Sequence, residues 1–191
     1  MGVDFTAVVD HSFGEAELLA LPDRLNARWE LPVSLRTWVE KHVRADSTRW
    51  KWERQPPASL ISEFLENGSV WLDGPHGFHA QVCRHALRVV HLARWWSFLY
   101  ESDVRLGLEE ACRGIARAVG AEHILYLPDN LAPPSAAGDM ILDGGSLDDA
   151  LSWLYSTVGP PIQDSTALPG PDVDDPYASA WFYERSERPG T

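Results

Sequence analysis

Hydrophobic and polar positions follow two patterns along the chain, one typical of strands and one typical of helices. Alternating or β-branched stretches predict strands at residues 3–11, 49–55, 68–74, 78–92, 123–128 and 177–185. The stretch at residues 78–92 is either one long strand or two strands around Arg84–His85. Helical spacing of apolar residues predicts helices at residues 14–26, 32–43, 59–66, 103–119 and 146–158. The elements follow one another without a regular β–α–β order, which favours the α+β class. We expect residues 1–191 to form a single α+β domain, with a mixed or mainly antiparallel sheet packed against about four helices.

The clearest element runs from Asp103 to Val119, where apolar residues recur every three or four positions. Gly120 follows it, and glycine is the residue type that most often ends a helix. The next stretch, His123–Pro128, has the apolar character of a buried strand. A strand, this helix and a second strand predict a crossover connection within one sheet.

The stretch RVVHLARWWSFLYE, residues 88–101, raises the question of an aromatic binding site because Trp95 and Trp96 are adjacent. An aromatic cage needs several rings that converge on a cation, whereas neighbouring side chains of a strand point to opposite faces. We therefore expect these rings to belong to the core, where a strand passes into the next helix. Arg94 is expected to reach solvent or to pair with a carboxylate.

Three further segments carry specific expectations. Trp50 and Trp52 are two residues apart, so a strand at residues 49–55 would place both on one face. Residues 140–145, MILDGG, predict a short strand or turn before a helix that Ser146 caps. Residues 159–176 hold five of the 14 prolines and predict a long Pro/Asp-rich surface loop.

The composition fits a domain that can bury a core, with 45% hydrophobic residues and nine tryptophans. No stretch approaches the roughly 18 apolar residues of a membrane-spanning helix, and no apolar leader is recognisable. Cys83 and Cys112 are too few for a disulfide framework. These features predict a cytoplasmic protein without a membrane partner. Of the 16 basic residues, 14 are arginine, a bias typical of bacterial genes rich in G and C.

Charge is distributed unevenly along the chain, whose net charge is −12. Residues 1–100 hold 12 acidic and 11 basic side chains, whereas residues 101–191 hold 16 acidic and five basic ones. Between Arg117 and Arg185 there are 11 carboxylates and no lysine or arginine. Such a field repels nucleic-acid phosphates and attracts a basic partner, although net negative charge also simply keeps proteins in solution.

No motif in the chain fixes a reaction. Asp10 and His11 end the first predicted strand and Asp129 ends the strand at residues 123–128, and catalytic groups often lie at such ends. No nucleophile elbow or metalloprotease motif accompanies them. We therefore assign no catalytic residue. A small hydrolase-like enzyme that uses Asp and His groups at strand ends remains an alternative to a binding protein.

Four side chains between residues 76 and 85 are of the types that bind zinc: His76, His79, Cys83 and His85. If residues 78–86 form a strand, His79, Cys83 and His85 face the same side and spread over roughly 20 Å, which suits a polar sheet face better than a tetrahedral site. The acidic segment 171–176 lacks the frame of a calcium loop, and DGGS at residues 143–146 lacks the lysine of a phosphate loop. We predict no metal ion and no cofactor.

Residues 24–54 carry eight basic and four acidic side chains, interleaved with four tryptophans at positions 29, 38, 50 and 52. Basic and aromatic side chains together can bind single-stranded nucleic acid by charge and stacking. The excess of only four positive charges, beside a strongly acidic half, argues against this, and core packing also explains the tryptophan spacing. We expect no nucleic-acid partner.

In size and composition alone, the chain is similar to the small acidic proteins that serve bacteria as antitoxins and immunity proteins, a likeness that implies no site residues. The leading hypothesis is a non-enzymatic, cytoplasmic protein-binding domain that neutralises a basic toxin. A structural or regulatory domain that oligomerises through an aromatic face is a further alternative, and the oligomeric state is not predicted. The expected partner-binding residues are Asp139, Asp143, Asp148, Asp149, Asp172, Asp174 and Asp175.

Overall fold

The computed structural model describes residues 3–43, 50–54, 68–129, 133–163 and 180–185. Seven strands form one antiparallel sheet with the order β2-β3-β4-β5-β1-β6-β7. They are β1 (Asp4–Asp10), β2 (Glu53–Arg54), β3 (Ser69–Asp73), β4 (Phe78–Cys83), β5 (Ala86–Arg94), β6 (His123–Pro128) and β7 (Phe182–Arg185). The predicted α+β class with an antiparallel sheet is confirmed.

The described residues also carry six helices, two more than the approximate number expected. They are α1 (Glu15–Arg28), α2 (Val33–His42), α4 (Trp95–Tyr100), α5 (Ser102–Val119), α6 (Pro134–Leu142) and α7 (Leu147–Thr157). None of the helices in these ranges is long and apolar enough to cross a membrane.

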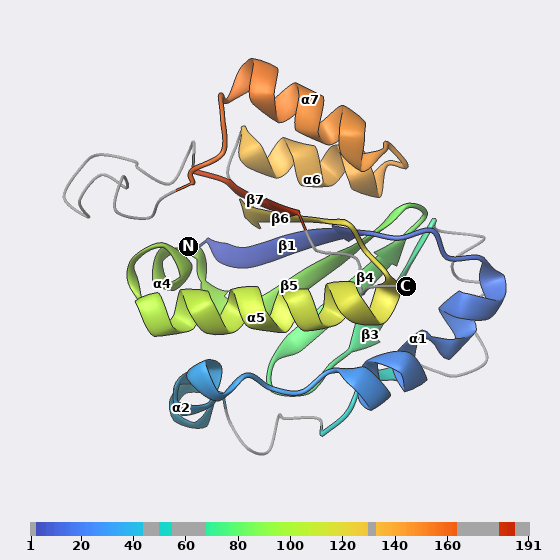
Figure 1. Ribbon diagram of the computed structural model, residues 1–191, viewed down its shortest axis with the longest axis vertical. Coiled ribbons are helices and arrows are strands. Elements are labelled where there is room, and N and C mark those ends of the chain that lie inside the picture. The colour runs from blue at the N-terminus through green and yellow to red at the C-terminus, as the bar shows by residue number, and fades with distance from the viewer. Residues whose placement is uncertain (1–2, 44–49, 55–67, 130–132, 164–179, 186–191) are drawn as a thin grey trace.

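The sheet separates two hydrophobic cores (Figure 1). Along β1, Phe5, Ala7 and Val9 face the larger core, which α1, α2, α4 and α5 complete. Val8 points to the opposite face and joins the smaller core, built with α6 and α7. Because successive side chains of a strand alternate between faces, a strand buried on both sides must be apolar almost throughout. This explains the continuous apolar run that predicted the first strand.

The expected crossover connects β5 to β6 through α4 and α5. Both strands pair antiparallel with β1, one on each side of it, so they run parallel to each other. The helix α5 ends as predicted at Gly120, whose backbone is left-handed with φ of 71°. Its inner face touches α2 closely at Gly107, where an added Cβ would lie 2.6 Å from the Cβ atom of Leu35.

The tryptophan pair at the end of β5 divides between core and surface. Trp95 is fully buried and stacks on Phe98, with ring centroids 4.9 Å apart. Trp96 is 43% exposed, so the prediction that both rings belong to the core is wrong for Trp96. The reason is that α4 begins at Trp95, and neighbouring helical residues point about 100° apart. Arg94 pairs with Asp4 at 2.5 Å.

The predicted common face of Trp50 and Trp52 is also wrong. Trp52 is 2% exposed, whereas Trp50 is 82% exposed. Of the described residues 50–54, only Glu53–Arg54 pairs with the sheet, so no strand alternation governs Trp50. Instead, the side chain of Asn26 on α1 holds the backbone of Trp52 with two hydrogen bonds. The Asn26 Oδ1 atom accepts one from the Trp52 N–H at 2.7 Å, and the Asn26 Nδ2 atom donates one to the Trp52 carbonyl at 2.9 Å.

The segment MILDGG, expected to be a short strand or turn, belongs in part to α6. This helix begins with Pro134, which is well suited to a first helical position, and buries Ala137 and Ile141 on one side. Residues 143–145 then form the turn before the helix that Ser146 caps. The predicted helix at residues 59–66 lies outside the described residues, as does most of the predicted loop at residues 159–176.

The close approach at Gly107 makes a testable prediction. Gly107→Ala should destabilise the protein by about 1–3 kcal/mol, because the new methyl group meets the backbone and Cβ atom of Leu35. Gly138→Ala is the matched control, since its nearest neighbour would lie 3.9 Å away and alanine favours a helix by up to about 1 kcal/mol. Urea unfolding midpoints measure both effects. A Gly107→Ala variant as stable as the unaltered protein would contradict the packing described here.

Candidate functional site

The smaller helical layer, α6 and α7, lies on the face of the sheet opposite α5 (Figure 1). Helix α7 begins at a capped N-terminus, where the Ser146 hydroxyl accepts the backbone N–H of Asp149 at 3.1 Å. This confirms the predicted turn and cap at DGGS. The helix then buries Leu147, Ala150 and Leu154 against the sheet.

Four of the seven predicted partner-binding residues lie on this layer and are exposed: Asp139, Asp143, Asp148 and Asp149. We call these four side chains the acidic layer. Residues 134–157 contain no lysine, arginine or histidine, and no ion pair to the acidic layer is found within the described ranges. The carboxylate of Asp149 accepts the Ser146 hydroxyl at 2.7 Å. The other three predicted residues, Asp172, Asp174 and Asp175, lie outside the described residues.

An exposed aromatic ring adjoins the acidic layer. Tyr155 is 51% exposed and follows Asp148 by seven residues, so both side chains lie on the same side of α7. Its ring stands nearly at right angles to that of buried Trp181, with centroids 5.4 Å apart. Partial burial raises the pKa of nearby Tyr183, the Arg185 guanidinium lowers it, and Tyr155 and Asp148 are among the groups that raise it further. Tyr183 therefore lies within electrostatic reach of both Tyr155 and Asp148.

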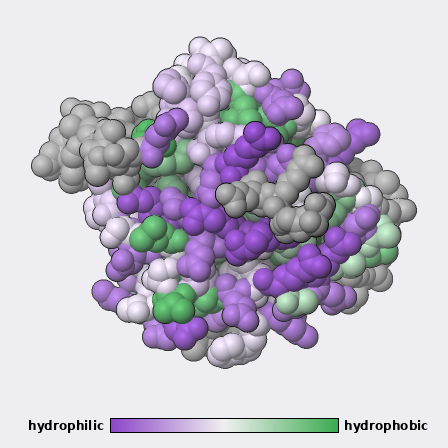
Figure 2. All heavy atoms as spheres, in the orientation of Figure 1, coloured by the Kyte–Doolittle hydropathy of each residue, from purple (hydrophilic) through white to green (hydrophobic). Residues whose placement is uncertain are grey.

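The face of the molecule seen in Figure 2 is mostly hydrophilic, with apolar side chains in small separate groups. The exposed tryptophans of the described chain lie on different elements. Trp71 belongs to β3, Trp96 to α4, and Trp50 to the segment before β2. Two of them have an aromatic neighbour, since Trp50 lies 6.3 Å from the His76 ring and Trp96 5.5 Å from the Tyr100 ring, measured between centroids.

The strand-end residues considered for catalysis each have a structural partner. The carboxylate of Asp10 accepts the backbone N–H groups of Glu122 and His123, at 2.9 and 2.8 Å, and so fixes the start of β6. His11 is buried, accepts the backbone N–H of Phe13 at Nδ1 and donates from Nε2 to the carbonyl of Cys83. Burial lowers the pKa of His11, which keeps the ring neutral.

Asp129, the third strand-end candidate, forms a partly buried ion pair with Arg88 on β5. The pair reaches across β1, which lies between β5 and β6, and ties the two neighbours of the central strand together.

The four side chains considered as zinc ligands lie at different places along the three antiparallel strands β3, β4 and β5 and their turns. His79 pairs with Asp73 at 3.1 Å, His76 lies in the turn before β4, and His85 is exposed in the next turn. Burial raises the pKa of the Cys83 thiol to about 11, so it is not a thiolate near neutral pH. Within the described ranges, no three His, Cys, Asp or Glu side chains converge on a metal position.

A polar network between α5 and β7 escaped the sequence interpretation. The Glu184 carboxylate accepts hydrogen bonds from the Arg113 guanidinium at 2.5 Å and from the Tyr126 hydroxyl at 3.0 Å. Arg113 also donates a hydrogen bond to Glu109 at 3.2 Å. Burial raises the pKa of Glu109. The sequence offers one signal, the spacing of Glu109 and Arg113 by four residues on a helix. The network fastens the last strand to the central helix.

Comparisons of the chain with protein-family models, with curated proteins and with solved structures found no match.

The buried histidine His91 makes the second prediction. It is fully buried, and burial lowers its pKa to about 3 from an ordinary value of 6.5. The folded protein keeps the His91 ring neutral, whereas the unfolded chain takes up a proton. The free energy of unfolding should therefore decrease as pH falls from about 6.5 toward 3.

Unfolding free energies of the unaltered protein and of His91→Gln, measured in urea from pH 8 to pH 4, test this. The free energy of unfolding of the variant should fall less steeply with decreasing pH than that of the unaltered protein. The two slopes should differ by up to about 1.4 kcal/mol per pH unit. Parallel curves for the two proteins would show that His91 does not stay neutral in the folded state.

Proposed function

We propose that this chain is a non-enzymatic protein-binding domain whose acidic layer docks a basic protein. In its most concrete form it is an immunity or antitoxin-type protein of the bacterial cytoplasm that neutralises a basic toxin. One observation carries the proposal: the acidic layer stands exposed on two adjoining helices that hold no basic side chain.

The electrostatics of such a surface favour fast and selective association with a positively charged protein. Helices that are packed on a sheet hold the carboxylates in fixed positions, so little conformational entropy is lost when a partner binds. Tyr155 adds an aromatic ring of the kind that often dominates binding energy at interfaces. The acidic layer supplies attraction and orientation, and the tyrosine supplies contact area.

The hydrolase alternative has less support. Asp10, His11 and Asp129 each hold a part of the backbone or an arginine in place, and the lowered pKa of His11 follows first from burial. These interactions explain the strand-end residues without any reaction. The oligomerisation alternative lacks a continuous aromatic face among the described elements.

The third prediction tests the acidic layer by removing three of its charges. The variant Asp139→Asn/Asp143→Asn/Asp148→Asn leaves Asp149 in place, because the Asp149 carboxylate takes part in the cap of α7. A matched control removes three exposed carboxylates from other elements. It is Asp23→Asn/Asp103→Asn/Glu110→Gln.

Each protein is immobilised and incubated with lysate of the source organism at about 50 and 300 mM salt, and the retained proteins are quantified by mass spectrometry. A protein of net positive charge should be retained by the unaltered chain and by the control, and lost from the acidic-layer variant and at high salt. Its purified form should bind the variant at least about tenfold more weakly. Equal retention by the two variants, or no effect of salt, would rule out the proposal.

A further inference from the structure

A pocket of about 740 Å³ opens on the other side of the molecule, away from the acidic layer. Residues from the α1–α2 connection, from α2, from residues 50–52 and from the turn between β3 and β4 line it. Its volume falls within the range of about 300–1,000 Å³ that holds small-molecule ligands. Segments far apart in the sequence thus build one concave site.

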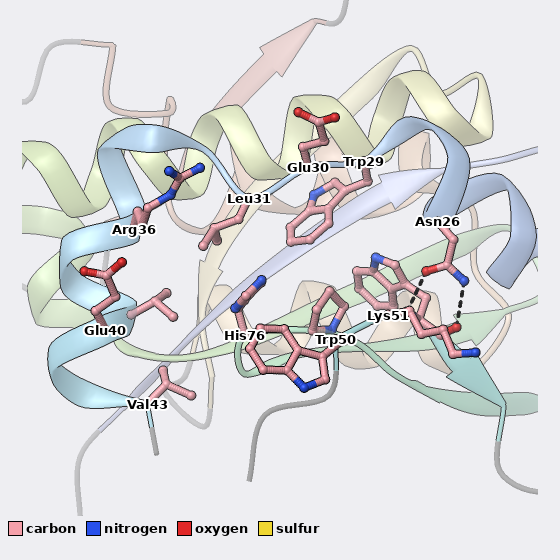
Figure 3. Close-up of a pocket in the computed structure, with 13 residues that line it drawn as sticks. Asn26, Trp29, Glu30, Leu31, Arg36, Glu40, Val43, Trp50, Lys51 and His76 are labelled. Carbon is pink, nitrogen blue, oxygen red and sulfur yellow. Dashed lines mark hydrogen bonds between the residues drawn. The ribbon is translucent and has the colours of Figure 1, made fainter. Parts of the chain in front are cut away.

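Tryptophan rings form much of the pocket wall (Figure 3). Trp29 and Trp52 are buried and meet edge to face, with centroids 5.7 Å apart. Trp29 is fixed by a hydrogen bond from its indole N–H to the carbonyl of Ala111 at 3.0 Å. Trp50, in contrast, is 82% exposed and leaves a large ring surface free at the mouth. A rigid wall and a free ring together suit a flat apolar ligand.

His76 brings a polar group into this apolar setting. Its backbone is left-handed, with φ of 58°, and the Nε2 atom of buried His91 donates to its carbonyl at 3.2 Å. Figure 3 shows the His76 ring between Trp50 and Leu31. Neither nitrogen of the His76 ring has a hydrogen-bond partner within the described ranges. A strained backbone that holds an unpaired polar ring in a pocket is typical of ligand sites.

One positive charge, that of Arg36, acts on His76. Burial lowers the pKa of His76, and the Arg36 guanidinium lowers it further, so the ring is neutral near pH 7. No carboxylate of the described chain forms an ion pair with Arg36, whereas Lys51 is engaged in an ion pair at 3.6 Å. The carboxylates of Glu30 and Glu40 point away from the hollow (Figure 3). Arg36 therefore offers a guanidinium at this pocket.

We propose that this pocket binds a small aromatic carboxylic acid, with its ring against Trp29 and Trp50 and its carboxylate on Arg36. The planar fork of a guanidinium matches a carboxylate with two parallel hydrogen bonds, and the neutral His76 ring can donate a further one. A phosphate dianion fits less well, because a single available guanidinium lines the pocket and would balance only one of its two charges. The proposal gives the basic, tryptophan-rich stretch of residues 24–54 a role that does not involve nucleic acid.

Three probes that share the indole ring and differ in charge test the proposal: indole-3-acetate, indole-3-acetamide and tryptamine. Calorimetric titration of the full chain at pH 7.5 should show indole-3-acetate binding at least about tenfold more tightly than its neutral amide. Tryptamine should bind most weakly. Arg36→Gln should abolish the preference for the acetate, and Trp50→Ala should weaken all binding about tenfold.

Both substitutions affect exposed side chains, so the fold should persist. Arg28→Gln and Trp71→Ala are matched controls at exposed positions outside the pocket, and they should leave the affinity for indole-3-acetate unchanged. Equal affinity for acetate and amide, or tightest binding of tryptamine, would overturn the proposal. So would tighter binding of an eight-nucleotide oligo(dT), which would assign the pocket to single-stranded nucleic acid.

Discussion

The burial of β1 on both faces is the constraint on which the rest of the structure depends. Its odd-numbered residues from Phe5 to Val9 enter the larger core, and Val8 enters the smaller one. Its two edges are paired with β5 and β6, so the strand has no face or edge left for solvent along most of its length. Any change that unpairs β1 therefore opens both cores at once. The crossover through α5 and the ion pair of Arg88 with Asp129 both connect β5 to β6, the two strands that flank β1.

The two cores give the molecule two chemically different sides. The side built by α6 and α7 carries exposed carboxylates that form no ion pair within the described ranges, which favours a basic protein. The side built by α1 and α2 holds a hollow with tryptophan walls and an available guanidinium. Since the sheet lies between them, the proposed protein surface and the proposed ligand pocket share no residue. Occupation of one leaves the other accessible, and each proposal stands or fails by itself.

The sequence predicts the elements whose signal is local, and it fails where contacts between distant segments decide. The helix from Asp103 and the Ser146 cap were predicted because period and end residues agree. Trp50 and Trp52 were misplaced because Asn26, which lies 26 residues before Trp52, fixes Trp52. The four described aspartates of the acidic layer follow from charge alone as candidates, and the structure shows that all four are exposed. The pocket cannot be predicted from local patterns because its wall joins segments far apart in the sequence, although residues 24–54 mix basic and aromatic side chains.

The central claim is that a basic protein docks on the acidic layer and not on the tryptophan pocket. Amide hydrogen exchange, measured with and without the basic protein recovered from lysate, tests it most directly, because it reports the contact surface residue by residue. The account predicts slower exchange along α6 and α7 in the complex and unchanged exchange along α2 and the turn that carries His76. Protection confined to α2 and that turn, with α6 and α7 unaffected, would contradict it.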